Sequence, residues 1–158
     1  MENQKPKIGV IHGRFQPLHS DHMKYLMAGF QRCNYMFIGI TNADPGHSAL
    51  HESDPNRSQS LANPLTYWER YLLIEASLQE AGIENNQFCI VPFPISKPEI
   101  RKYYVPFDAV FLITIYDDWG RHKRDMLLSL GLKVDVMWED DILQKGITGT
   151  SVRSRIRN

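Results

Sequence analysis

The chain has 158 residues, and its 18 Lys and Arg against 18 Asp and Glu give a formal net charge of zero. Domains cluster near ~100–150 residues, so we expect one domain over residues 1–158. Balanced charge weighs against a nucleic-acid or membrane-surface binder, though it allows a local basic pocket. The polar start and the lack of an apolar run near ~18–20 residues predict a cytoplasmic protein, in which Cys33 and Cys89 are buried thiols.

The first part of the chain predicts two strands around a helix. Residues 7–12 and 35–40 are short apolar runs typical of strands, and apolar side chains recur at helical spacing over 21–33. Residues 41–64 are rich in turn-forming residues and have no period, so we expect a loop there. Connections of that length in compact domains are usually functional or mobile.

The middle of the chain predicts a capped helix, a strand and a short helix. Thr66 and Glu69 have the spacing of a capping box, which opens a helix over 66–80. Residues 88–91 predict a third strand. The prolines that follow leave room only for a short helix near 99–103.

The last part predicts strands over 109–115 and 133–137, a helix over 117–130 that Asp117 or its neighbour caps, and a terminal helix over 150–157. Strands that alternate with helices predict a Rossmann-like α/β fold: a doubly wound, five-stranded parallel sheet with helices on both faces. Ligands of such folds bind beyond the carboxyl ends of the strands, near the switch point.

The turn after the first strand falls at that place. Gly13 can adopt backbone conformations closed to other residues, and Arg14 offers a planar fork suited to phosphate. If the helix begins near Leu18, His19 and His22 share one face at its N-terminus, where free N–H groups and the dipole favour an anion. The alternatives are a pair of surface histidines and a zinc site, which would need a third and a fourth ligand.

A second anion-receiving helix start is predicted near the end of the chain. Gly149 and Thr150 can open a helix, with the Thr150 hydroxyl as cap and Arg153 one turn later. The alternative is a capped terminal helix with a solvated basic end.

These residues carry a family resemblance. Residues 13–17, Gly-Arg-Phe-Gln-Pro, followed by His-x-x-His, resemble the signature of the HxGH nucleotidylyltransferase superfamily, closest to archaeal-type nicotinamide-nucleotide (NMN) adenylyltransferases. Residues 147–153 resemble that family's C-terminal motif, and 63–70 and 104–106 resemble two weaker segments. The likeness spans residues 8–156.

The resemblance implies an enzyme that joins a phosphate-bearing small acceptor, NMN in the nearest relatives, to the nucleotide of a triphosphate such as ATP, releasing pyrophosphate. Mg²⁺ would be carried on the triphosphate, and archaeal-type relatives form homo-oligomers. The alternatives are a cytidylyl- or other nucleotidylyltransferase with a different acceptor, and a domain that binds nucleotide without turnover.

The family's roles carry over to matching positions. His19 and His22 would contact the α- and β-phosphates, and Arg14 would hold a phosphate beside the backbone of Gly13 and Phe15. Arg153 completes the catalytic set. The nucleotide-binding residues of the C-terminal motif would be Thr148, Thr150, Ser151 and Arg153.

One position departs from the family pattern, because Asp21 replaces the glycine of His-x-Gly-His. A carboxylate in the first helical turn suits the dipole, but one that faced a triphosphate would repel it. Further candidates for substrate contact are Tyr104, Asp117 and Trp119, with core packing or helix capping as the alternative for each.

Overall fold

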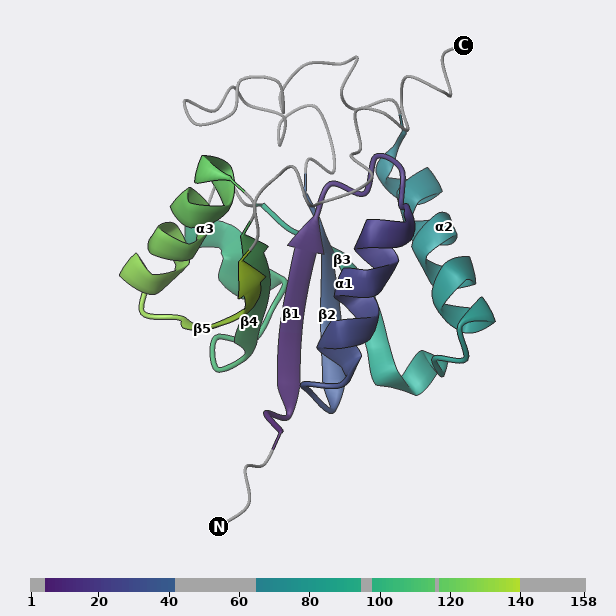
Figure 1. The fold of residues 1–158 in the computed structure, drawn as a ribbon, viewed down its shortest axis with the longest axis horizontal. Helices are drawn as coiled ribbons and strands as arrows, with labels where there is room; N and C mark the ends of the chain where they lie inside the picture. The colour runs from purple at the N-terminus through teal and green to yellow at the C-terminus, as the bar shows by residue number, and fades with distance from the viewer. Residues whose placement is uncertain (1–4, 42–64, 95–97, 116, 140–158) are drawn as a thin grey trace.

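The computed structural model describes residues 5–41, 65–94, 98–115 and 117–139, which form a layered α/β structure (Figure 1). The strands are β1 (Ile8–Gly13), β2 (Tyr35–Ile40), β3 (Phe88–Pro92), β4 (Val110–Ile115) and β5 (Lys133–Glu139). The helices are α1 (Ser20–Phe30), α2 (Tyr67–Glu80) and α3 (Asp118–Ser129), with the 3₁₀ turns η4 (Asn85–Gln87) and η5 (Pro98–Tyr103).

The five strands form one parallel sheet in the order β3-β2-β1-β4-β5. Gly13 at the end of β1 lies opposite Ile40 of β2, which in turn lies opposite Pro92 of β3. The carboxyl ends of these strands therefore meet at one edge. The predicted five-stranded parallel sheet is confirmed.

Helices cover both faces of the sheet, as predicted. Successive residues of a strand point to opposite faces, and Ile11 of β1 packs in one apolar cluster with Leu26 of α1 and Ile74 of α2. Val10 packs in a second cluster with Leu127, in the last turn of α3. Because the helix after β1 and the helix after β4 lie on different faces, the switch point of the fold lies between these two strands.

The structure corrects two element boundaries. Helix α1 ends at Phe30, not at residue 33, because Gln31 is its C-cap and the Cys33 thiol turns back to donate to the Gly29 carbonyl, 3.4 Å away. The turn η4 was not predicted, since three residues are too few to show a period. The predicted helix over 150–157, and all but the first residue of the predicted loop over 41–64, lie outside the described residues.

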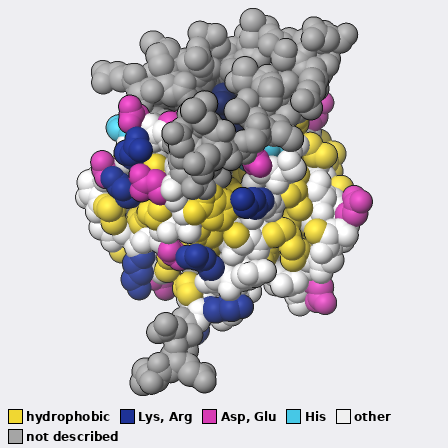
Figure 2. Space-filling model, viewed as in Figure 1, with side chains coloured by type: hydrophobic (Ala, Val, Ile, Leu, Met, Phe, Trp, Pro, Cys, Tyr) yellow, Lys and Arg dark blue, Asp and Glu magenta, His cyan; other side chains and the backbone are white. Residues whose placement is uncertain are grey.

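Charges of both signs are mixed on the described part of the face drawn in Figure 2, with hydrophobic side chains between them. Trp68 and Leu72 of α2 are among the exposed large hydrophobic side chains. Within the described ranges, no helix has the length and apolar character needed to cross a membrane.

Candidate active site at the carboxyl end of the first strand

The turn after β1 holds an unusual backbone conformation. Phe15 has a φ of 52°, in the left-handed region that bulky residues rarely adopt, and strain of this kind clusters at functional sites. Its ring is 1% exposed and lies edge-on to His22, with ring centroids 5.0 Å apart. The conformational freedom predicted for Gly13 is not used, since the left-handed residue is Phe15. A Cβ at Gly13 would come within 3.2 Å of the Phe15 ring, so glycine leaves room for that ring.

The two predicted histidines lie together at the start of α1. His19 is the N-cap, with extended backbone (φ −143°, ψ −177°), so the helix begins one residue after it rather than near Leu18. The His19 and His22 rings are stacked, with centroids 3.8 Å apart and planes 19° from parallel. The expected pairing of the imidazoles is therefore confirmed, although His19 itself is not helical.

A hydrogen bond selects the tautomer of the neutral His22 ring. The backbone N–H of His19 donates to His22 Nδ1 over 3.3 Å. An imidazole nitrogen that accepts a bond carries no proton, so in the neutral ring Nε2 carries it. His22 thereby presents an N–H donor at the positive end of the helix dipole, which is the arrangement that suits a phosphate oxygen.

Arg70, in the first turn of α2, ties together three segments around the turn. It is 1% exposed, and it donates from Nη1 to the carbonyls of Arg14 (2.9 Å) and Thr41 (2.7 Å), and from Nε to that of Thr66 (3.1 Å). Burial lowers the pKa of Arg70 to about 10, which keeps it charged at neutral pH. The sequence motifs assign Arg70 no role. The spacing that could have indicated its burial is four residues, which places Arg70 on the same face of α2 as Ile74 and Leu78.

Gln16 makes a second tie between the turn and α2. Its side chain is buried, and it donates to the Leu65 carbonyl (2.9 Å) and accepts from the Leu65 N–H (2.8 Å). No sequence pattern indicates this pair, because its members are 49 residues apart.

The site is electropositive. The charge of Arg14, beside that of Arg70, lowers the pKa of Arg70 further, so the two guanidinium groups act on the same region. Together with the N-terminus of α1 and the His22 donor, they make a place that attracts an anion with several negative charges.

Comparison with known proteins identifies the family. No family model matches the chain. It is 47% identical to phosphonoformate cytidylyltransferase of Streptomyces viridochromogenes, over 94% of this chain and 79% of the relative. The chain belongs to the nucleotidylyltransferases. It is also 30% identical to the NMN adenylyltransferase of Pyrococcus furiosus, over 95% of this chain and 73% of that relative. It is 35% identical to that of Thermococcus onnurineus, over 67% of this chain and 53% of that relative.

A solved structure agrees on the fold. The bifunctional NMN adenylyltransferase/ADP ribose pyrophosphatase of Francisella tularensis superposes with a TM-score of 0.67 at 19% identity, over 95% of this chain and 42% of that chain. The resemblance to nucleotidylyltransferases that the turn after β1 predicted is thus confirmed.

The structure brings five of the predicted residues into one turn and helix start: Gly13, Arg14, Phe15, His19 and His22. Thr148, Thr150, Ser151 and Arg153 lie outside the described residues, so the expected convergence of two helix starts stays a prediction. Asp21 occupies the second residue of α1, in the first turn, where a carboxylate is stabilised by the dipole.

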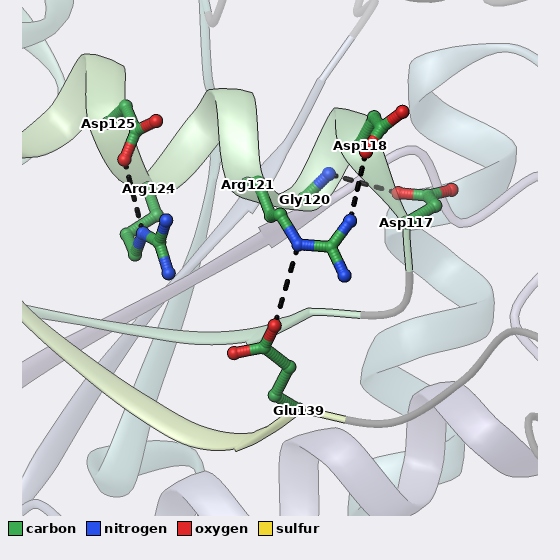
Figure 3. Close-up of polar contacts among 7 residues, drawn as sticks. All are labelled: Asp117, Asp118, Gly120, Arg121, Arg124, Asp125 and Glu139. Carbon is green, nitrogen blue, oxygen red and sulfur yellow. Dashed lines mark hydrogen bonds and ion pairs between the residues drawn. The ribbon is translucent and has the colours of Figure 1, made fainter.

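Asp117 caps α3, one of the two interpretations considered for it. Its side chain accepts from the Gly120 N–H over 2.9 Å, and Arg121 on the same helix pairs with Asp118 (2.9 Å) and Glu139 (3.5 Å), as Figure 3 shows. The ion pair of Arg121 with Glu139 ties the first turn of α3 to the carboxyl end of β5. A contact of Asp117 with substrate stays a prediction.

The two aromatic candidates lie on the second face of the sheet. Tyr104 is half-buried against the apolar cluster that includes Val10 and Phe111, and Trp119 lies in the first turn of α3. Their predicted substrate contacts stay predictions. Within the described residues, no group of three or more His, Cys, Asp or Glu is arranged to hold a metal ion, so that part of the chain offers His19 and His22 no third ligand for zinc.

Proposed function

We propose that the protein transfers a cytidylyl group from CTP to a small acid that carries a phosphonate or phosphate, with release of pyrophosphate. The observation that carries this choice of nucleotide and acceptor is the 47% identity to a phosphonoformate cytidylyltransferase over 94% of the chain. It replaces NMN and ATP as our preferred pair, because the NMN adenylyltransferase relatives are 30–35% identical.

The chemistry needs no general base. An ionised oxygen of the acceptor attacks the α-phosphorus, a new P–O bond forms, and the bond to the β-phosphate breaks as pyrophosphate leaves. Positioning and charge stabilisation provide most of the catalysis in transfers of this kind. The Nε2 proton of His22 and the N–H groups at the start of α1 stabilise the charge that develops on the phosphate oxygens, and Arg14 and Arg70 raise the local positive potential.

The triphosphate would enter as its Mg²⁺ complex, because Mg²⁺ prefers phosphate oxygens and water to a protein cage. The donors described at the turn are imidazole and guanidinium groups, which suit the phosphates rather than the ion.

We also propose that the enzyme acts in the cytoplasm as a homo-oligomer. Cys33 is buried as expected, whereas Cys89 is only partly buried, and both are free thiols, which supports a reducing compartment.

The experiment is a matrix of two triphosphates and two acceptors. Purified protein with Mg²⁺ is given CTP or ATP, together with phosphonoformate or NMN, and pyrophosphate release is followed by a coupled assay. We expect the CTP and phosphonoformate pair to be at least tenfold faster than any other. Fastest turnover with ATP and NMN contradicts the proposed substrates, and triphosphate binding without pyrophosphate release indicates a sensing domain.

Adenylyl transfer to NMN is the second candidate. It is supported by the 30% identity to the Pyrococcus furiosus enzyme over 95% of the chain. The same matrix decides between the two, since both the base and the acceptor differ.

A further inference from the structure

Arg101 carries a buried charge that the proposed mechanism does not use. It lies in η5, on the segment that leaves β3 at one edge of the sheet and crosses to β4 beside β1. The residue is 8% exposed. Within the described part of the chain, its buried Nε and Nη1 atoms have no hydrogen-bond partner.

The protein contacts of Arg101 do not balance the cost of burying it. A guanidinium stays charged at all physiological pH values, and an unpaired buried charge is strongly destabilising. Its ring contact is with Phe107, 5.8 Å from the guanidinium carbon, and that ring is 61% exposed. A cation–π contact at such a site is too weak to compensate. Arg70, comparably buried, donates to three carbonyls instead.

The crossing segment is connected to the site through packed rings. Phe93, at its start, stacks on His12 with centroids 4.8 Å apart and planes 9° from parallel, and His12 immediately precedes Gly13. Val105, whose N–H donates to the Arg101 carbonyl, packs on the second face against Val10 of β1 and Phe111 of β4. Arg101 therefore lies in the segment that covers the second face of β1 and β4, the two strands that form the switch point.

We propose that Arg101 binds a second anionic group of the acceptor, a carboxylate attached to its phosphonate or phosphate. This inference rests on the proposed function. In-line transfer places the acceptor opposite the leaving pyrophosphate, and the anion site of α1 lies on the first face of the sheet while Arg101 comes from the second. A planar guanidinium matches a carboxylate through paired N–H bonds. Arg101 would therefore select small acidic acceptors over those with a neutral group.

The test compares two acceptors that differ in the carboxylate. We expect Arg101→Gln to raise KM for phosphonoformate at least twentyfold with kcat changed less than threefold, while KM for methylphosphonate stays the same. Arg101→Lys restores part of the affinity. The matched control is Lys102→Gln, which removes the exposed neighbouring cation and leaves both KM values unchanged. Equal effects on both acceptors, or a raised KM for the triphosphate alone, overturn the proposal.

A binding measurement keeps this proposal separate from the proposed function. If the wild type turns over neither acceptor, the proposed function fails, and Arg101 is then tested by the shift in Tm that millimolar phosphonoformate causes. We expect a rise in Tm for the wild type that Arg101→Gln abolishes. If Arg101→Gln does not fold, Arg101→Lys takes its place, with an expected reduction of the shift by at least half. Absence of a shift in the wild type, or an equal shift in the variant, overturns the proposal.

Discussion

Replacing Arg70 by methionine tests whether the turn after β1 is held in place from α2. The variant removes three side-chain hydrogen bonds, but Thr66 O keeps the bond from the Arg70 backbone N–H, so two carbonyls lose their side-chain donor: those of Arg14 and Thr41. Each hydrogen bond from a charged donor contributes about 1.5–3 kcal/mol. Relief of the buried charge offsets part of that sum. We expect a net loss of about 2–4 kcal/mol in the free energy of unfolding.

The assay is urea unfolding at 25 °C, together with kcat/KM for both substrates. Because the Arg14 carbonyl belongs to the turn in which we propose that catalysis occurs, Arg70→Met should also lower kcat/KM at urea concentrations where the protein is fully folded. Arg70→Lys keeps the charge, but its single ammonium cannot donate to all three carbonyls at once, so we expect an intermediate loss. Arg124→Met is the control, since Arg124 pairs only with its neighbour Asp125 among the salt bridges of the described residues. A loss below about 0.5 kcal/mol, which is the usual effect of a surface substitution, refutes the reasoning.

Three further variants test the site and its surroundings. His22→Ala should lower kcat at least tenfold with an unchanged circular dichroism spectrum, and an unchanged kcat removes His22 from the mechanism. Asp21→Gly should leave turnover equal or higher, while a complete loss shows that Asp21 has a role the family pattern does not predict. Burial raises the pKa of Tyr67 to about 12, so the folded state holds its proton while the unfolded chain loses it near pH 10. Stability is therefore lost as the pH rises from 10 to 12. Tyr67→Phe should lessen this loss, measured as the free energy of unfolding in urea at each pH. Identical pH profiles for the variant and the wild type contradict this prediction.

Much of the fold could be predicted because local signals agree with the global arrangement. The Thr66 and Glu69 box forms as expected, with the Glu69 N–H donating to the Thr66 hydroxyl (3.1 Å), and Gly82 follows that helix with a φ of 89°. The parallel sheet followed from strands that alternate with helices. The start of α1 was harder, because histidine is not among the usual N-caps and the sequence left the first helical residue between Leu18 and Asp21.

The site could be predicted only where its residues are close in sequence. The turn after β1 and the His19 and His22 pair lie within ten residues, and their spacing indicated a phosphate site. The contacts of Arg70 join residues 29 and 56 positions away, and no periodic pattern reports a hydrogen bond to a distant backbone carbonyl. The burial of Arg101 could not be predicted for the same reason, since it depends on how the segment between β3 and β4 packs in the folded chain.

The most direct measurement of the central claim follows the α-phosphorus itself. The protein is incubated with Mg²⁺, phosphonoformate and CTP labelled with ³²P at the α-position, and the products are separated by thin-layer chromatography. The account predicts label in a new mixed anhydride of CMP and phosphonoformate with the wild type, and its loss with His22→Ala. Label that remains in CTP, or that appears only as free CMP, contradicts nucleotide transfer at the turn after β1.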